Sequence, residues 1–214
     1  WRLAIANLHR PGALTPALVL SLGLGVTLVV TLGLIDAGLR RELTRSLPER
    51  APAFFFLDVQ ANEADTFETF LRQTVPGGAV ERVPMMRGRI VSLKGIRVQD
   101  YPAPEEVAWV LEGDRGITFA ETPPEGSALV AGDWWPADYG GAPLVSFDAE
   151  IARQLGLGVG DAVVVNVLGR EIAATVANLR SVEWRTLGIN FVMVFSPNTF
   201  AGAPYTVLAT LTEP

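Results

Sequence analysis

Residues Ala13 to Ile35 read ALTPALVLSLGLGVTLVVTLGLI, and this stretch decides the architecture of the chain. It contains no charged side chain. At 1.5 Å per residue, a helix of this length is about 34 Å long, enough to cross a hydrocarbon core about 30 Å thick. In that core every backbone N–H and C=O must be bonded within the segment, so a helix is the expected form. The sequence therefore predicts one transmembrane helix.

Two other interpretations of this stretch stay open. A buried helix of a water-soluble domain normally keeps a polar stripe and is shorter. A cleaved signal peptide has an apolar region of about 7–15 residues followed by a small-residue cleavage site. Here the apolar run is longer and leads directly into a charged segment with a helical period. A membrane helix explains both features better.

The segment Asp36 to Leu47, DAGLRRELTRSL, keeps the helical period. Leu39, Leu43 and Leu47 line one face, while charged residues cover the other. Pro48 ends the pattern. We therefore expect the membrane helix to continue into water as a stalk, with these three leucines transmitting motion.

Small side chains recur along the membrane helix at Ala17, Ser21 and Gly25. A spacing of four places them on one helical face, and small residues let a second membrane helix approach closely. Small residues are also common in membrane helices, so chance is the alternative explanation. We expect this face to pack against a partner helix.

Composition excludes several function classes. The net charge is −6, so no basic surface indicates nucleic-acid binding. There is no cysteine, which excludes disulfides and cysteine-based metal sites. The only histidine, His9, precedes the membrane helix, so a Ser/His/Asp arrangement cannot form in the rest of the chain. We expect no cofactor and no catalytic residues.

The segment after the stalk predicts an α/β unit. Ala53 to Gln60, AFFFLDVQ, is typical of a buried strand. A helix should follow, with Phe67, Phe70, Leu71 and Val75 on its inner face, and then a strand over Val80 to Leu93 broken around Pro84. This β-α-β order is similar to one half of a split, ferredoxin-like layer.

From Ile96 onward, short strands and turns dominate. Val107, Trp109 and Leu111 alternate and predict one strand of a hairpin, with Ile117 and Phe119 on the other. A short helix should bury Ile151 and Leu155 and end at Gly156. Later strands are predicted over Ala162 to Val167, Glu171 to Arg180, Gly188 to Ser196 and Tyr205 to Leu211.

Four features have both a chemical and a structural interpretation. Gly156, Gly158 and Gly160 follow a helix and precede a strand, the wrong order for a dinucleotide fingerprint, so a cap and turn are expected. Glu105 and Glu106 are expected to be solvated. The other two are Arg87 and Arg89, either an anion site or a solvated strand face, and Trp134, Trp135 and Tyr139, either a docking loop or a cover over the core.

Several stretches together resemble FtsX/MacB-type ABC transporter permeases, closest to the YbbP-like, two-repeat branch. The first is RLAIANLHRPGALTPALVLSLGLG, which is similar to the start of a core membrane helix. The others resemble the extracytoplasmic domain of that branch: PPEGSALVAGDWW (123–135), LVSFDAEIARQLGLGVGDAVVVNVLGREIAATVANLRSVEW (144–184) and NFVMVFSP (190–197). Their order and spacing carry the resemblance, which covers nearly the whole chain.

The resemblance implies an α+β architecture: one transmembrane helix with a stalk, then a MacB-like extracytoplasmic domain in which a membrane-proximal α/β lobe is split around an inserted β-rich lobe. It implies residues 1–50 as cytoplasmic edge, membrane helix and stalk, 51–95 plus 188–214 as the membrane-proximal lobe, and 96–187 as the inserted lobe. The N-terminus would be cytoplasmic and the globular part periplasmic, in a bacterial inner membrane. Because the chain begins with Trp1 and ends at Pro214, we expect it to be part of a longer protein.

In this family a separate ATPase subunit drives the permease from the cytoplasm. ATP hydrolysis moves stalks and extracytoplasmic domains, which act on lipids, lipoproteins or hydrophobic compounds. The chain itself would not be an enzyme. The alternative is a single-pass, membrane-anchored binding or sensor domain without an ATPase, and an anchored hydrolase is disfavoured by the missing histidine and cysteine.

Overall fold

A computed structural model of the chain describes residues 15–46, 52–184 and 188–213, which form two units. The first is helix α2 (Thr15–Ser46), continuous for 32 residues. The apolar stretch and its charged extension therefore form one helix, as predicted. Within it, Ala17–Arg41 is long and apolar enough to cross a membrane.

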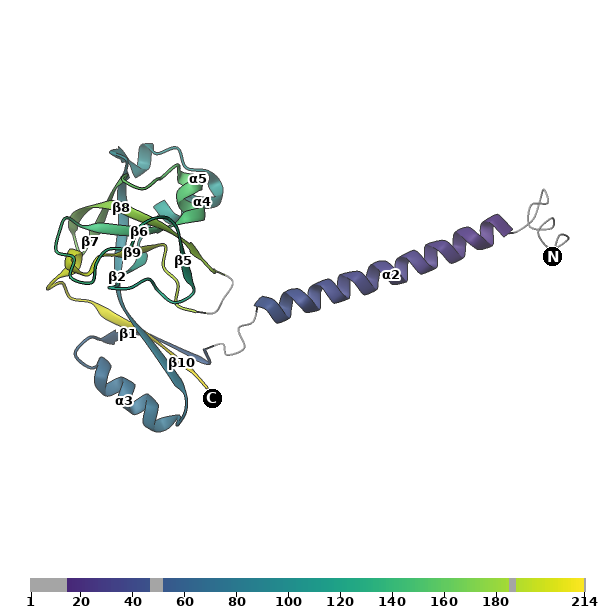
Figure 1. The fold of residues 1–214 in the computed structure, drawn as a ribbon, viewed down its shortest axis with the longest axis horizontal. Coiled ribbons are helices and arrows are strands. Elements are labelled where there is room, and N and C mark those ends of the chain that lie inside the picture. The colour runs from purple at the N-terminus through teal and green to yellow at the C-terminus, as the bar shows by residue number, and fades with distance from the viewer. Residues whose placement is uncertain (1–14, 47–51, 185–187, 214) are drawn as a thin grey trace. The chain divides into compact units, whose positions relative to one another are not determined.

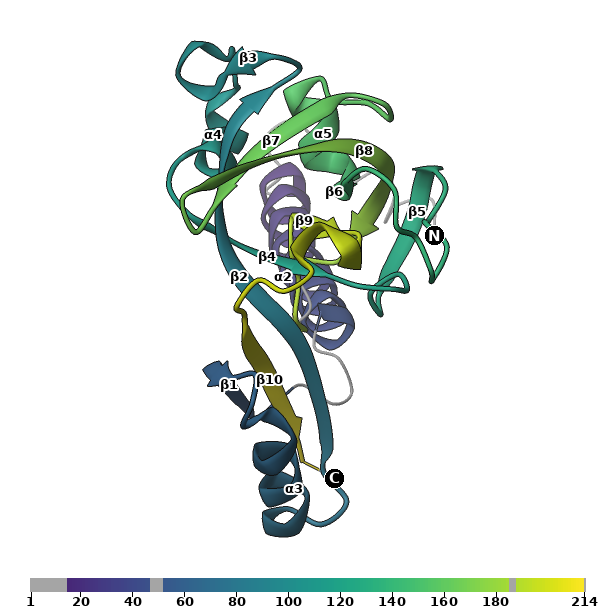
Figure 2. The same ribbon diagram turned by 90° about the vertical axis from the view of Figure 1, so that its left-hand side faces the viewer.

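The second unit begins with a split β-α-β arrangement. Strand β1 (Phe54–Gln60) leads into helix α3 (Ala64–Thr74) and then into strand β2 (Ala79–Leu93). The last strand, β10 (Thr206–Thr212), lies between β1 and β2 and is antiparallel to both. Helix α3 lies against this open sheet, as Figure 2 shows. The predicted split layer is therefore present.

The remaining strands close into a barrel. Starting from β2, each strand pairs with the next and the last, β7, pairs with β2 again. A closed sheet has no free edge strand within the ring. The other members, in ring order, are β4 (Arg115–Phe119), β9 (Met193–Phe195), β6 (Leu144–Asp148), β8 (Arg170–Val182) and β7 (Ala162–Val167).

Short elements complete the barrel region, and the main hydrophobic core lies inside the ring. Helices α4 (Glu105–Leu111) and α5 (Ala149–Leu155) lie together at one end of the domain, away from α3 (Figure 1). Asp148 caps α5 by accepting a hydrogen bond from the Ile151 N–H (2.8 Å), and Gly156 ends it in the left-handed conformation, as predicted. The other elements are β3 (Ile96–Arg97), β5 (Ser127–Gly132), and the 3-10 turns η1 (Val98–Asp100) and η2 (Pro197–Phe200).

Strand β2 belongs to both parts of the domain. Residues 79–85 pair with β10 in the open sheet, and residues 86–93 pair with β4, β7 and β3 in the barrel. The predicted break at Pro84 is wrong, because β2 runs through it without interruption. Residues 79–85 of β2 pair only with β10, so the other edge of the strand forms no ladder hydrogen bonds there. A proline, which lacks an N–H, is tolerated at such a position.

Other local predictions are also wrong. Phe70, expected on the inner face of its helix, is 58% exposed on α3. Residues 107–111 form helix α4 instead of a strand: Pro104 precedes it, Glu105 and Glu106 favour the N-terminal end of a helix, and Val107, Val110 and Leu111 are buried at helical spacing. Strand β1 is an edge strand and largely exposed, because it pairs with β10 only and α3 lies on one side of the sheet.

Candidate functional site

The residues predicted to pack in the membrane lie open on α2. Ala17, Ser21 and Gly25 follow one another at one-turn spacing and are exposed. A Cβ added to Gly25 would meet no atom within 4 Å. Packing of a second helix on this face stays a prediction, and the geometry leaves room for it.

The predicted stalk leucines are placed only in part. Leu39 lies on α2 with 59% of its surface exposed, Leu43 is in the same helix, and Leu47 lies outside the described residues. About one turn before Leu39, Asp36 accepts a hydrogen bond from Arg40 Nε (2.9 Å). Such a pair is expected on the solvated side of a helix that extends beyond the apolar stretch. The role of these leucines in transmitting motion stays a prediction.

The barrel carries an unusual hairpin tip. Strands β7 and β8 are joined at Leu168 and Gly169, both with positive φ (51° and 83°). The left-handed conformation suits glycine, asparagine or aspartate and is rare for a bulky residue. Leu168 nevertheless occupies it and is 64% exposed. A strained, exposed apolar residue at a loop tip is a reason to look for a functional surface there.

Three surface depressions meet at Leu168, and we call them together the Leu168 groove. Their volumes are about 580, 560 and 320 Å³. The first is also lined by η2 and the segment that follows it, the second by Arg87 and Arg89, and the third by Met85, Met86 and Tyr205. One hairpin tip thus borders an almost continuous hollow surface of the domain.

The groove combines apolar residues with charged side chains of both signs: Arg87, Arg89 and Arg170 line it together with Asp58, Asp114 and Glu171. Met85 and Met86 are both buried and line the third depression, and methionine adapts to ligands of irregular shape. Arg89 pairs with Asp114 (Nη2 to Oδ1, 3.1 Å), whereas Arg87 forms no ion pair within the described part of the chain. Arginine binds phosphates and carboxylates. The arrangement suits a ligand with an apolar body and an anionic group.

The two arginines point outward for a structural reason. Gly88, between them, faces the barrel core, where a Cβ would come within 2.8 Å of Ile117 Cδ1. Because side chains alternate along a strand, Arg87 and Arg89 lie on the opposite face and are exposed. Sequence reasoning found the pair but missed Leu168, although a leucine in a two-residue hairpin loop was a readable signal.

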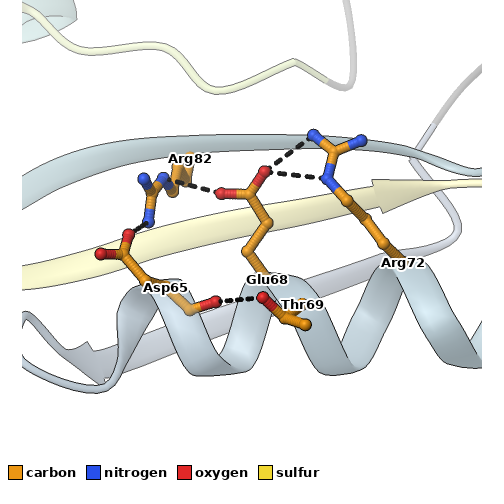
Figure 3. A network of polar contacts seen from close by, with 5 residues as sticks. All are labelled: Asp65, Glu68, Thr69, Arg72 and Arg82. Atoms are coloured by element: carbon orange, nitrogen blue, oxygen red, sulfur yellow. Dashed lines mark hydrogen bonds and ion pairs between the residues drawn. The ribbon is translucent and has the colours of Figure 1, made fainter.

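An ion-pair network fixes α3 on the open sheet. Figure 3 shows Arg82 of β2 between two carboxylates of α3, Asp65 (Nη1 to Oδ1, 2.6 Å) and Glu68 (Nε to Oε2, 3.1 Å). Glu68 also accepts hydrogen bonds from Arg72, one turn further along. The hydrogen bond to Asp65 raises the pKa of Arg82, with burial opposing it and both carboxylates adding to the rise. The network is structural and ties α3 to β2.

A second arginine is buried in the barrel wall. Arg180 of β8 is 1% exposed and donates a hydrogen bond to the Phe191 carbonyl. Burial lowers its pKa to about 10, with Asp148 opposing the shift. Asp148 in turn accepts a hydrogen bond from Trp184 Nε1 (2.8 Å). These contacts tie the segment that leads to β9 onto the barrel.

The remaining candidates have structural explanations. The indole N–H groups of Trp134 and Trp135 bond to the carbonyls of Glu121 and Ala120, and Trp135 is 4% exposed, so this loop covers a core. Gly156 is a helix cap and Gly160 lies in a turn with φ 93°, which confirms the predicted cap and turn. Among the described residues no group of three or more His, Cys, Asp or Glu side chains is arranged to hold a metal.

Comparison with known proteins gives one informative match. No family model and no solved structure matches this chain. It is similar to the uncharacterized ABC transporter permease YbbP of Escherichia coli (strain K12), with 26% identity over 205 residues. The alignment covers 95% of this chain and 24% of the relative, so the chain spans about a quarter of the length of the curated relative it matches. This finding confirms the resemblance to YbbP-like permeases.

Proposed function

We propose that the chain is the part of an ABC transporter permease that carries one membrane helix and one extracytoplasmic domain. The observation that carries this proposal is the extent of the similarity to the YbbP permease, which includes the helix and nearly all of the domain. A match confined to the apolar helix would have said little, because apolar helices resemble one another. The proposal places the N-terminus in the cytoplasm and the domain in the periplasm.

In this proposal a separate ATPase subunit hydrolyses ATP in the cytoplasm, and α2 carries the movement outward. Ala17, Ser21 and Gly25 form the face that packs against another membrane helix. Leu39, Leu43 and Leu47 line the stalk face that transmits the motion. A continuous helix suits this role, since α2 extends past the apolar stretch without interruption.

We also propose the two-lobe division of the domain, with residues 51–95 and 188–214 as the membrane-proximal lobe and 96–187 as the inserted one. The open sheet of β1, β10 and β2 with α3 supports the first lobe. Strand β9, although in the 188–214 segment, pairs with β4 and β6 and so takes part in the barrel. The two lobes therefore share strands at their junction.

The proposed substrates are lipids, lipoproteins or hydrophobic compounds, and the proposed contact surface is the Leu168 groove. Its exposed leucine and buried methionines favour an apolar chain, and its arginines favour an anionic group. A phosphatidylglycerol with a photoreactive acyl chain tests this directly. Cross-linking should map to the β7–β8 hairpin and weaken in Leu168→Asp but not in Leu168→Met; unchanged cross-linking in Leu168→Asp would rule the groove out.

The decisive experiment uses the full-length permease together with its ATPase subunit in lipid nanodiscs. Leu39→Pro should break the stalk and uncouple ATP hydrolysis from movement of the domain, followed by distances between spin labels, while Leu39→Met should preserve coupling. Coupling that survives Leu39→Pro would argue against a stalk. Failure to copurify any ATPase would favour the anchored binding or sensor domain.

A further inference from the structure

The open sheet ends in a group of exposed apolar side chains that the proposed function does not use. Phe54, Phe55 and Leu57 of β1 and Phe70 of α3 have 51%, 48%, 64% and 58% of their surface exposed. We call these four residues the aromatic edge. Single exposed apolar residues are common, but a concentration of four large ones on two neighbouring elements is typical of an interaction site.

The aromatic edge has apolar groups on both faces of its strand. Phe54 stacks on Phe56 (centroids 6.3 Å apart), and Phe56 meets Phe67 of α3 edge-on (5.0 Å), so Phe54 lies on the α3 side. Phe55 lies on the other face, because neighbouring side chains of a strand alternate. Apolar side chains therefore lie on both faces of the sheet at its border. Such a convex apolar edge suits insertion into a lipid bilayer better than docking on a flat protein surface.

Only a short stretch of chain separates the membrane helix from the aromatic edge. Helix α2 ends at Ser46, and β1 begins at Phe54. Eight residues span at most about 28 Å, and the five helical residues after Arg41, where the apolar stretch ends, add about 7.5 Å. The length of the intervening chain therefore sets an upper limit of about 36 Å between the end of the apolar stretch and Phe54.

Pairing with a second copy through the free edge of β1 is disfavoured by the backbone. Asp58 has a positive φ (57°), and the register with β10 shifts between Phe56 and Val59. Such a bulge bends an edge strand and interrupts the row of groups that another strand would need. Asp58 also adds a charge there, which is a common protection against edge pairing.

From these observations we infer that the aromatic edge lies in the interfacial region of the bilayer that α2 crosses. Phe54, Phe55, Leu57 and Phe70 are the inserted side chains, and the partner is the phospholipid surface itself. The inference rests on α2 spanning the membrane and does not depend on transport activity. It makes the open sheet a second, peripheral point of attachment for the domain.

The absence of cysteine makes a clean test possible. Single variants Phe55→Cys, Phe70→Cys and, as the control on the barrel, Val130→Cys (62% exposed) carry a nitroxide label. The full chain is reconstituted in vesicles of phosphatidylcholine and phosphatidylglycerol. Collision of the label with oxygen, which concentrates in lipid, is compared with collision with a water-soluble nickel chelate.

Labels at positions 55 and 70 should collide several-fold more with oxygen relative to nickel than the label at 130. In a Phe54→Gln, Leu57→Gln background, with the fold checked by near-ultraviolet circular dichroism, the label at 55 should shift toward nickel access. Equal nickel access at 55 and 130 would overturn the inference. So would spin–spin broadening at position 55 that disappears on dilution with unlabelled chain, which would assign the edge to a second copy.

Discussion

The two parts of the domain that β2 joins expose their apolar residues to very different degrees. In the barrel half, Ile90 and Leu93 are at most 1% exposed inside a closed ring. Beside the other half lies an open sheet of three strands whose outer strand leaves Phe54 and Phe55 half in water. Closure removes edges because every ring strand is paired on both sides, whereas an open sheet with one helix leaves its border uncovered. The barrel supplies stability, and the open sheet keeps an apolar surface available.

The most direct way to break this comparison is to truncate a phenylalanine in each part. Phe147→Ala, in the barrel core and 0% exposed, should lower the free energy of unfolding by about 3–5 kcal/mol. Phe55→Ala, on the open sheet, should change it by about 0.5 kcal/mol or less. Urea unfolding of the full chain in detergent, followed by tryptophan fluorescence, measures both. Similar losses would mean that β1 is covered by something else.

The two structural arginines give the next largest contrast. Arg180→Met removes a buried cation and leaves Asp148 without it, so a loss on the order of 3 kcal/mol is expected. Arg82→Met removes an ion-pair network whose arginine is 40% exposed, and a loss of about 1 kcal/mol or less is expected. The same urea titration compares them. A larger loss for Arg82→Met would show that the open sheet, not the barrel, limits stability.

Leu168 should behave in the opposite way, because it is the strained point of the barrel. Leu168→Asn relieves a left-handed leucine and should raise the free energy of unfolding by about 1 kcal/mol. The matched control is Val159→Asn, a half-exposed apolar residue without a positive φ, which should have little effect. If both variants stabilise equally, removal of exposed apolar surface and not relief of strain is the cause.

The smallest expected effect depends on pH and lies on the open sheet. Burial, with a contribution from Glu125, raises the pKa of Glu81 above its usual value of 4.5. The folded state then binds the proton more tightly than the unfolded state, so ionised Glu81 costs stability once the pH rises through this range. Glu81→Gln should therefore stabilise the chain slightly at pH 7 and have no effect well below pH 4.5. Unfolding at both pH values tests the sign.

Local sequence patterns predicted the helices and strands of this chain better than they predicted which strands pair. The helix α2, the cap at Gly156 and the split layer followed from apolar length, left-handed glycine and element order. Ring closure depends on pairs such as β2 with β7 and β4 with β9, far apart in sequence, and no local period encodes them. The exposure of β1 follows from the same fact, since AFFFLDVQ reads as buried unless its place at the edge is known.

The candidate site was predictable only in fragments. The sequence shows Arg87 and Arg89 as a pair that flanks a glycine. That these arginines line one groove with Met85 and Leu168 depends on the strand pairing of the barrel, which the sequence does not reveal. The strand prediction for residues 107–111 was wrong for a different reason. In the seven-residue helix α4, the spacing of Val107, Trp109 and Leu111 also matches the alternation of a strand, although Trp109 is exposed. The two carboxylates of Glu105 and Glu106, which favour the N-terminal end of a helix, indicated the structure better than the apolar alternation did.

The direction of a pull decides how the β1–β10 pairing would respond to force. Strand β1 begins at Phe54 opposite Leu211 and continues to Gln60 opposite Thr206, so a load applied at Phe54 along the strand is shared by the hydrogen bonds of the ladder at once, in shear. A load perpendicular to the strand would open the same bonds one after another, as a zipper opens. A force along β1 would therefore move the domain as one body, whereas a force perpendicular to the strand would detach β1 from β10.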